Sequence, residues 1–139
     1  MLRNVSYKND STKNEIDGLI GNSYSFIEKI KKGGVGSGKL LITKANKEIE
    51  NLLILDQNTN NCNIELRAKG IIIYFRSLLE TYGLAIPYYK LVVFKVTEYE
   101  YTFNIDSKFL KIKVKSENDH SFIRKIMEEK AKNTENYIL

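Results

Sequence analysis

The stretch YEYTFNIDSKFLKIKVK, residues 99–115, decides the fold class of this chain. Apolar and polar residues alternate over residues 99–105, the tripeptide Asp106-Ser107-Lys108 interrupts them, and the alternation resumes from Leu110 to Val114. This period of two predicts two strands, each with one buried and one wet face, joined by a tight turn. One-sided alternation is typical of antiparallel meanders rather than of buried parallel sheets.

Five apolar runs precede this hairpin, and each predicts a further strand, which gives seven strands in all. They span residues 39–45, 49–55, 64–67, 71–75 and 88–96. Ala68-Lys69-Gly70 predicts a hairpin turn, because glycine adopts a positive φ readily. Residues 56–63 predict a loop. Residues 77–87 leave open a short strand, a turn of helix, or both, and Pro87 excludes the middle of a central strand.

The N-terminal part of the chain predicts one helix. Residues 1–12 show no period and predict a frayed end. Over residues 13–32, apolar residues recur at intervals of three and four, which predicts a helix that covers the sheet or docks onto a partner. They are Ile16, Leu19, Ile20, Tyr24, Ile27 and Ile30. The glycine-rich residues 33–38 predict a flexible joint. The chain therefore divides into an N-terminal helical segment with its linker, 1–38, and a domain over 39–139.

The C-terminal part predicts a second helix. Asn118 or Asp119 can cap its first turn. A short apolar stripe follows, and residues 128–132 continue the helix into solvent. The stripe consists of Phe122, Ile123, Ile126 and Met127. Four apolar residues over less than two turns suit a plug on the mouth of a barrel.

Seven strands in meander order followed by one amphipathic helix resemble the pleckstrin-homology-like superfamily. The hairpin over residues 64–75 and the step IPYYKL, residues 86–91, are similar to bacterial pleckstrin-homology domains and their GRAM-like relatives. The resemblance implies a mainly β, α+β fold: a bent, partly open seven-stranded antiparallel barrel, capped by the C-terminal helix, with an extra N-terminal helix. It also implies self-association, which is common among bacterial relatives of this fold.

Length and composition narrow the class of protein. The chain has 139 residues, which fits one domain, and a formal net charge of +5, which permits phosphate-rich partners without requiring them. Cys62 is the only cysteine, so no internal disulfide can form, and a lone thiol suits a reducing compartment. No apolar run approaches the ~20 residues of a membrane span, and no secretory signal is evident. We expect a cytoplasmic protein, with peripheral membrane attachment as the alternative.

One glycine-rich motif is similar to a phosphate-binding loop, but the neighbouring sequence does not fit such a loop. GGVGSGK, residues 33–39, has the glycine spacing of a phosphate-binding loop. That loop needs a strand before it, a helix after it, and Ser or Thr after the lysine. Here a predicted helix precedes, a predicted strand follows, and Leu40 follows Lys39. The context favours a linker.

His120 is the only histidine and Cys62 the only cysteine, so the sequence predicts no cluster of histidine and cysteine metal ligands. Cys62 has no charged neighbour in the sequence to activate its thiol, and His120 beside a helix start predicts an ordinary surface residue. We therefore predict no catalytic residue, no metal and no cofactor, and expect that the chain is not an enzyme.

One basic cluster is predicted, conditional on the barrel. In such a barrel the turns after the first, third and sixth strands gather at the open end, opposite the helix. Those turns carry Lys44, Lys47, Arg67, Lys69 and Lys108. Five cations at one rim would attract a phosphorylated or acidic ligand.

Two functions follow. The first is a non-catalytic module that binds protein partners or copies of itself through exposed strand edges. The second is peripheral binding of anionic lipid, or another phosphate-bearing ligand, at the basic rim. Nucleic acid is disfavoured, because the net charge is modest and spread along the strands.

Overall fold

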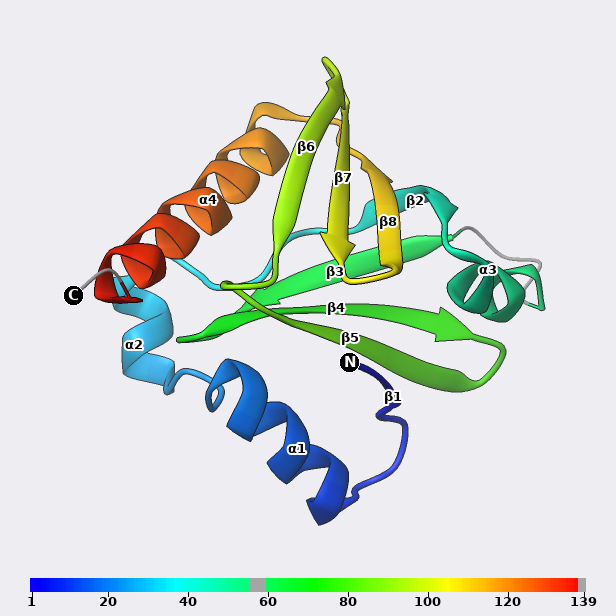
Figure 1. Ribbon diagram of the computed structural model, residues 1–139, viewed down its shortest axis with the longest axis horizontal. Helices are drawn as coiled ribbons and strands as arrows, with labels where there is room; N and C mark the ends of the chain where they lie inside the picture. Colours follow the sequence, from blue (N-terminus) through cyan, green and yellow to red (C-terminus); the bar gives the residue numbers. More distant parts are fainter. Residues whose placement is uncertain (56–59, 138–139) are drawn as a thin grey trace.

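Eight antiparallel strands form one sheet in the order β1-β5-β4-β3-β2-β8-β7-β6 (Figure 1). The computed structural model describes residues 1–55 and 60–137. The strands are β1 (Leu2–Asn4), β2 (Leu40–Ala45), β3 (Asn61–Leu66), β4 (Gly70–Ser77), β5 (Glu80–Pro87), β6 (Val92–Thr97), β7 (Glu100–Ile105) and β8 (Lys108–Lys113). The helices are α1 (Asp10–Ile20), α2 (Phe26–Lys31), α3 (Lys47–Ile54) and α4 (Glu117–Tyr137).

The sheet bends at β2, which pairs with β3 on one side and β8 on the other. The register between β2 and β8 shifts between Ile42 and Lys44, as at a β-bulge, which adds local twist and bend. Figure 1 accordingly shows β6, β7 and β8 running across the direction of β3, β4 and β5. Both groups of strands contribute to one core, in which Phe75 and Phe103 are among the largest fully buried side chains.

The α+β class, the antiparallel sheet and the C-terminal helix are confirmed. The strand count is eight rather than seven, and the sheet is not closed, since β1 and β6 form its two edges. Residues 1–12, predicted to fray, contain β1, in which Arg3 pairs with Gly83 of β5. The alternation over residues 99–115 gives β7 and β8, joined at Asp106.

Helix α4 packs against the core through Ile123 and Ile126, and Phe122 is partly buried beside them, whereas Met127 is exposed. Its N-cap is Ser116 rather than the predicted Asn118 or Asp119. The Ser116 hydroxyl accepts a hydrogen bond from the Asp119 amide, and the Asp119 carboxylate accepts one from the Ser116 amide. Such reciprocal capping fixes the first turn of the helix.

The predicted helix over residues 13–32 is two helices. Gly21 ends α1 with a φ of 89°, a left-handed conformation that glycine tolerates at helix ends. Ile16 and Ile20 of α1 pack on Ile72 and Ala85, on the outer face of β4 and β5. The apolar stripe therefore covers the sheet only in its first half.

The predicted joint over residues 33–38 is partly ordered by pairing with β3. Val35 is buried, and its carbonyl accepts a hydrogen bond from the Leu66 amide. Ser37 donates its amide to the Ile64 carbonyl and accepts the Ile64 amide at its hydroxyl. Only Gly33 and Gly34 have a positive φ in this segment.

The prediction of a strand over residues 49–55 is wrong, because this segment lies in α3. Ile49 and Leu53, four residues apart, are buried, which is a helical spacing that a short apolar run conceals. The ambiguous residues 77–87 belong to β5 and the turn before it. The predicted loop 56–63 overlaps β3 from Asn61, and residues 56–59 lie outside the described residues.

Gly70 is required for space, not for positive φ. A Cβ atom at this position would lie 2.6 Å from Cγ2 of Ile20 and 2.9 Å from Cα of Pro87, and would also collide with the Ile86 carbonyl oxygen. Its φ is not positive, unlike that of Gly21. The absent side chain lets α1 and β5 approach the start of β4.

We expect Gly70→Ala to lower the free energy of unfolding by roughly 2 kcal/mol, because the added methyl group overpacks this contact. The matched control is Gly18→Ala in the last turn of α1, where an added Cβ meets nothing within 4 Å. It should stabilise the protein by up to about 1 kcal/mol. Urea denaturation measures both, and equal effects would refute the packing argument.

The β4–β5 turn carries a strained leucine. Ser77 pairs with Glu80, so Leu78 and Leu79 are the two central residues, and Leu78 alone has a positive φ, of 57°. A positive φ at only the first central position is the pattern of a type II′ turn, which favours glycine there.

Leu78→Gly should raise the free energy of unfolding by about 1 kcal/mol, because a positive φ is energetically unfavourable for a residue that has a Cβ atom. Leu79→Gly should give no such gain, because its φ is not positive. Thermal and urea denaturation of the two variants test the pair. A Leu78→Gly variant less stable than the parent would contradict the prediction.

Candidate functional site

The five predicted rim cations do not share one end of the sheet. Lys44, near the end of β2, lines a hollow together with Glu50 and Leu53 of α3. Lys47 begins α3, and Lys108 Nζ lies 3.8 Å from a Glu48 carboxylate oxygen on the same helix. These three cations therefore gather around α3.

Arg67 and Lys69 belong to the β3–β4 turn, next to α4 at the far end of the strands. Asn133 of α4 donates a hydrogen bond to the Ala68 carbonyl in that turn. The following turn, between β4 and β5, lies against α3, because the Ser77 hydroxyl bonds the Leu52 carbonyl. Successive hairpin turns lie at opposite ends of a meander. Because residues 49–55 were predicted as an extra strand, the β3–β4 turn was predicted at the wrong end of the sheet.

Arg67 is a buried structural cation, with 6% of its surface exposed. Its Nη1 lies 3.1 Å from Asp17 Oδ1 and 2.9 Å from the Gly21 carbonyl oxygen, and its Nε lies 3.2 Å from Glu65 Oε1. The guanidinium thus joins α1 to β3. Because the guanidinium is buried and already paired with carboxylates, it stabilises the fold and is not accessible to a ligand.

The neighbours of Arg67 complete an ion network. The Tyr74 hydroxyl donates to Glu65 over 3.2 Å, and Lys13 Nζ lies 2.6 Å from the Asp17 carboxylate. The hydrogen bond from Lys13, with a further one from Arg67, holds the pKa of Asp17 below its ordinary value. Burial, and then the nearby Glu65 carboxylate, raise the pKa of Tyr74.

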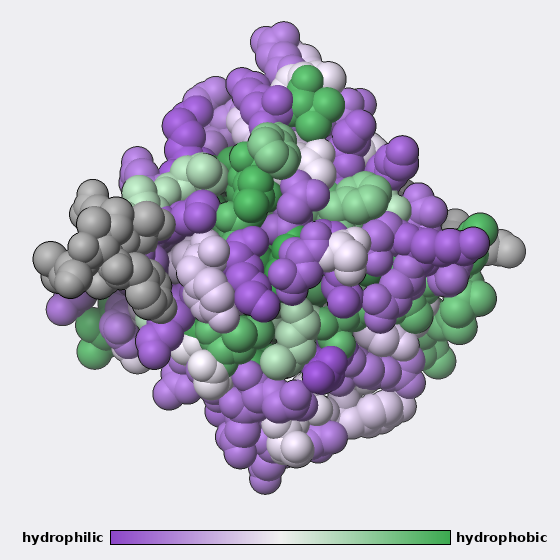
Figure 2. Space-filling view, in the orientation of Figure 1, coloured by the Kyte–Doolittle hydropathy of each residue, from purple (hydrophilic) through white to green (hydrophobic). Residues whose placement is uncertain are grey.

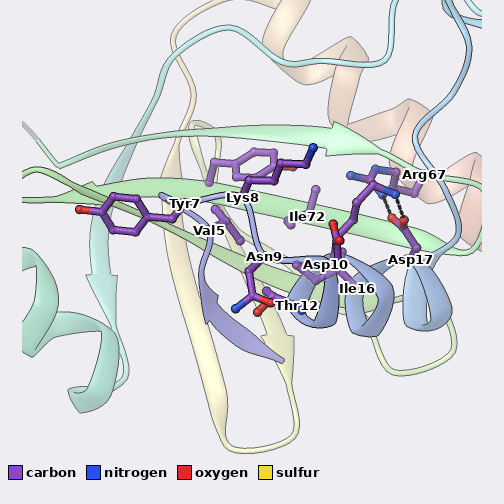
Figure 3. A pocket seen from close by; sticks show the side chains of 12 residues that line it. Val5, Tyr7, Lys8, Asn9, Asp10, Thr12, Ile16, Asp17, Arg67 and Ile72 are labelled. Carbon is purple, nitrogen blue, oxygen red and sulfur yellow. Dashed lines mark hydrogen bonds and ion pairs between the residues drawn. The ribbon is translucent and has the colours of Figure 1, made fainter.

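A pocket of about 200 Å³ lies beside this network, between α1, the segment before it and the outer face of β4. Figure 3 shows Arg67 and Asp17 facing each other at one end and Val5 and Tyr7 at the other. Drug-sized ligands usually occupy at least ~300 Å³. Because Asp17 and Arg67 neutralise each other, the pocket presents no concentrated charge.

Neither residue considered for catalysis is arranged for it. Cys62 is buried, and burial raises the pKa of its thiol to about 12, so the thiolate is not formed near neutral pH. His120 of α4 is half-buried rather than an open surface residue, with Nδ1 2.8 Å from the Tyr101 hydroxyl. Within the described ranges, no three His, Cys, Asp or Glu side chains converge to hold a metal.

The exposed edge of the sheet at β6 is the most distinctive surface. Val92, Phe94 and Val96 are 44%, 59% and 47% exposed, and Val96 lies where the register with β7 shifts. Figure 2 shows apolar surface along the position that β6 occupies in Figure 1. Among the described strands, β6 pairs with β7 alone, so its other edge carries unpaired backbone groups.

The opposite face of β6 explains why this row is exposed. Val93 pairs with Phe103 and packs against the core, and Lys95 pairs with Tyr101, with Nζ 5.9 Å from its ring centre. On this face the core uses Val93, which is partly buried, whereas Lys95 remains exposed. Residues 88–96 are apolar at both sets of positions, so the sequence did not indicate which set is exposed.

The other sheet edge is protected differently. β1 has only three residues, and its central residue, Arg3, forms an ion pair of 3.1 Å with Glu15 of α1. Short length and charge are common protections of edge strands against pairing with another chain. β6 is longer and carries one charge, Lys95, and its register with β7 shifts between Lys95 and Thr97, so its regular edge runs over residues 92–95.

Comparison with known proteins found no family model that matches the chain, no matching curated protein and no matching solved structure. None of the helices within residues 1–55 and 60–137 combines the length and the apolar character that crossing a bilayer requires.

The ion network makes stability depend on pH. Because the folded pKa of Asp17 is below the ordinary 3.8, its contribution is complete above that value and disappears as the pH falls through the folded pKa. We expect Asp17→Asn to destabilise the protein by roughly 2 kcal/mol at neutral pH. The difference from the parent should shrink in strong acid.

Urea denaturation from about pH 7 to about pH 2 measures this difference. The control is Asp10→Asn, which removes an exposed carboxylate from the first turn of the same helix. It should cost much less at neutral pH. A loss for Asp17→Asn that persists unchanged in acid would argue against the network as its cause.

Proposed function

We propose that the chain is a non-catalytic interaction module that binds a protein partner, or a second copy of itself, by adding a strand at the free edge of β6. The observation that carries the proposal is the combination of unpaired edge backbone with the exposed row of Val92, Phe94 and Val96. Strand addition uses both features: main-chain hydrogen bonds provide affinity, and alternate side chains provide specificity.

The general architecture supports a pleckstrin-homology-like assignment. Strands β2 to β8 are consecutive in the chain, the first of them pairs with the last, and α4 packs against the core that they enclose. A bent, open sheet of seven sequential strands with a C-terminal helix is what the resemblance implies. We propose this family as the origin of the fold, with β1, α1 and α3 as additions.

Self-pairing of β6 is compatible with its sequence. In an antiparallel pair of two copies centred on Phe94, the two Phe94 residues lie opposite one another. Lys95, the only charged residue in the strand, then lies opposite Val93 rather than another Lys95. Like charges directly opposite one another destabilise a strand pair, and this register avoids them. A two-fold arrangement also makes the interface self-complementary and closed.

The test is sedimentation equilibrium of the purified chain with Phe94→Lys. We expect the parent to associate as its concentration rises and Phe94→Lys to remain monomeric, because the added charge would be buried at the centre of the new strand pair. Asn14→Lys, at an exposed position of α1, adds the same charge away from β6 and should associate like the parent.

A partner other than the same chain is tested by affinity capture with the same three proteins. A parent that stays monomeric at the highest attainable concentration and captures no partner through β6 would contradict the proposal. So would a Phe94→Lys variant that associates or captures as the parent does.

A further inference from the structure

Helix α2 is oriented with its apolar residues outward. Phe26, Ile27 and Ile30 are 77%, 65% and 63% exposed. Lys29 and Lys32 are the half-buried positions of the same segment. Lys32 Nζ lies 3.8 Å from a Glu129 carboxylate oxygen of α4 and 4.8 Å from the centre of the Tyr24 ring. In an ordinary surface helix the apolar residues face the protein and the lysines face the solvent.

Polar contacts stabilise both ends of the helix, and those at its C-terminal end join it to α4. Ser25 and Glu28 form a reciprocal capping box at the start. At the end, Lys125 of α4 donates to the carbonyl oxygens of Lys32 and, over 2.6 Å, of Gly34. A six-residue helix has little stability of its own, so these contacts hold α2 against α4 and keep its apolar side in solvent.

The charge around the apolar side is mainly positive. Segment 26–32 carries Lys29, Lys31 and Lys32 against one acid, Glu28. On the facing helix, Glu129 is shared between Lys32 and Lys132, while Lys125 is engaged with backbone carbonyls. Glu128 is a further exposed acid on α4. Within the segment itself, Lys31 is exposed and Lys29 half-buried near the three exposed apolar side chains, while Lys32 is paired with Glu129.

We propose that α2 is a membrane-docking element that inserts Phe26, Ile27 and Ile30 into the interface of an anionic bilayer. Lys29 and Lys31 would then lie at the level of the lipid phosphates. Interfacial helices combine an apolar side with bordering lysines in this way, and each lysine near an anionic surface adds to the attraction. The inference is independent of the function proposed for β6.

A bilayer suits this surface better than a protein. The apolar side chains protrude from a short helix at the outside of the molecule, where Figure 1 shows α2 beside the far end of α4. Three side chains offer much less area than the ~800 Å² that each partner buries in a standard protein interface. A fluid interface needs neither that area nor a matching groove, and the lysines provide complementarity to anionic headgroups.

The experiment is co-sedimentation of the full chain with vesicles containing about 30% phosphatidylserine, compared with pure phosphatidylcholine. We expect binding to the anionic vesicles that falls as salt rises. Replacing Phe26, Ile27 and Ile30 together by serine should weaken this binding roughly tenfold or more. The matched control replaces Val92, Phe94 and Val96 of β6 by threonine and should bind vesicles like the parent.

A second readout follows insertion directly. The chain has no tryptophan, so Phe26→Trp introduces a single fluorophore. Its emission should shift to shorter wavelength with anionic vesicles and be quenched by bromine-labelled lipid chains. Lys29→Glu with Lys31→Glu should reduce binding and retain the fold.

The proposal is overturned if the parent does not bind anionic vesicles, or if the triple serine variant binds them as well as the parent. It is also overturned if Phe26→Trp emission is unchanged in the bound state. Association lost in the triple serine variant, without any vesicle binding by the parent, would identify α2 as a protein contact instead. A parent that neither self-associates nor captures a protein through β6, but binds vesicles through α2, would refute only the function proposed for β6.

Discussion

The double pairing of β2 is the interaction on which the rest of this structure depends. β2 is the only described strand that joins the group β1, β5, β4 and β3 to the group β8, β7 and β6. Because its register with β8 shifts after Ile42, one continuous sheet can bend there and enclose a single core. The bend leaves the sheet open, so β1 and β6 remain as edges. The properties of those edges then decide which surfaces are available to other molecules.

Some apolar surface of the sheet and helices is covered by other elements, and some is exposed. α1 covers the outer face of β4 and β5, and the buried Arg67 fixes that cover to the sheet through Asp17 and Glu65. No comparable element covers the outer row of β6 or the apolar side of α2 within the described residues. Exposed apolar side chains gathered on one element often mark interaction sites. The two surfaces lie on different elements, so a chain docked on a bilayer through α2 would keep its β6 edge available.

Sequence patterns predicted the parts of the fold that local periodicity controls. Residues 99–115 gave two strands, and the stripe at Ile123 and Ile126 gave the C-terminal helix, because one face of each is buried and the other is not. The strand prediction for residues 49–55 was wrong, because their apolar run is too short to distinguish the two-residue period of a strand from the 3.6-residue period of a helix. Arg67 was chosen as a rim cation because the carboxylate that neutralises it, Asp17, lies fifty residues away in the sequence. The β6 edge could not be predicted, since residues 88–96 are apolar at both sets of alternate positions.

The central claim is that β6 is the edge at which another chain adds. Amide hydrogen exchange followed by mass spectrometry, on dilute and concentrated solutions of the unmodified chain, tests it most directly. Peptides covering Val92–Thr97 should exchange more slowly in the concentrated sample, while those covering α1 should be unchanged. Association accompanied by protection elsewhere, for example over Phe26–Lys31, with β6 exchanging equally fast at both concentrations, would contradict the claim.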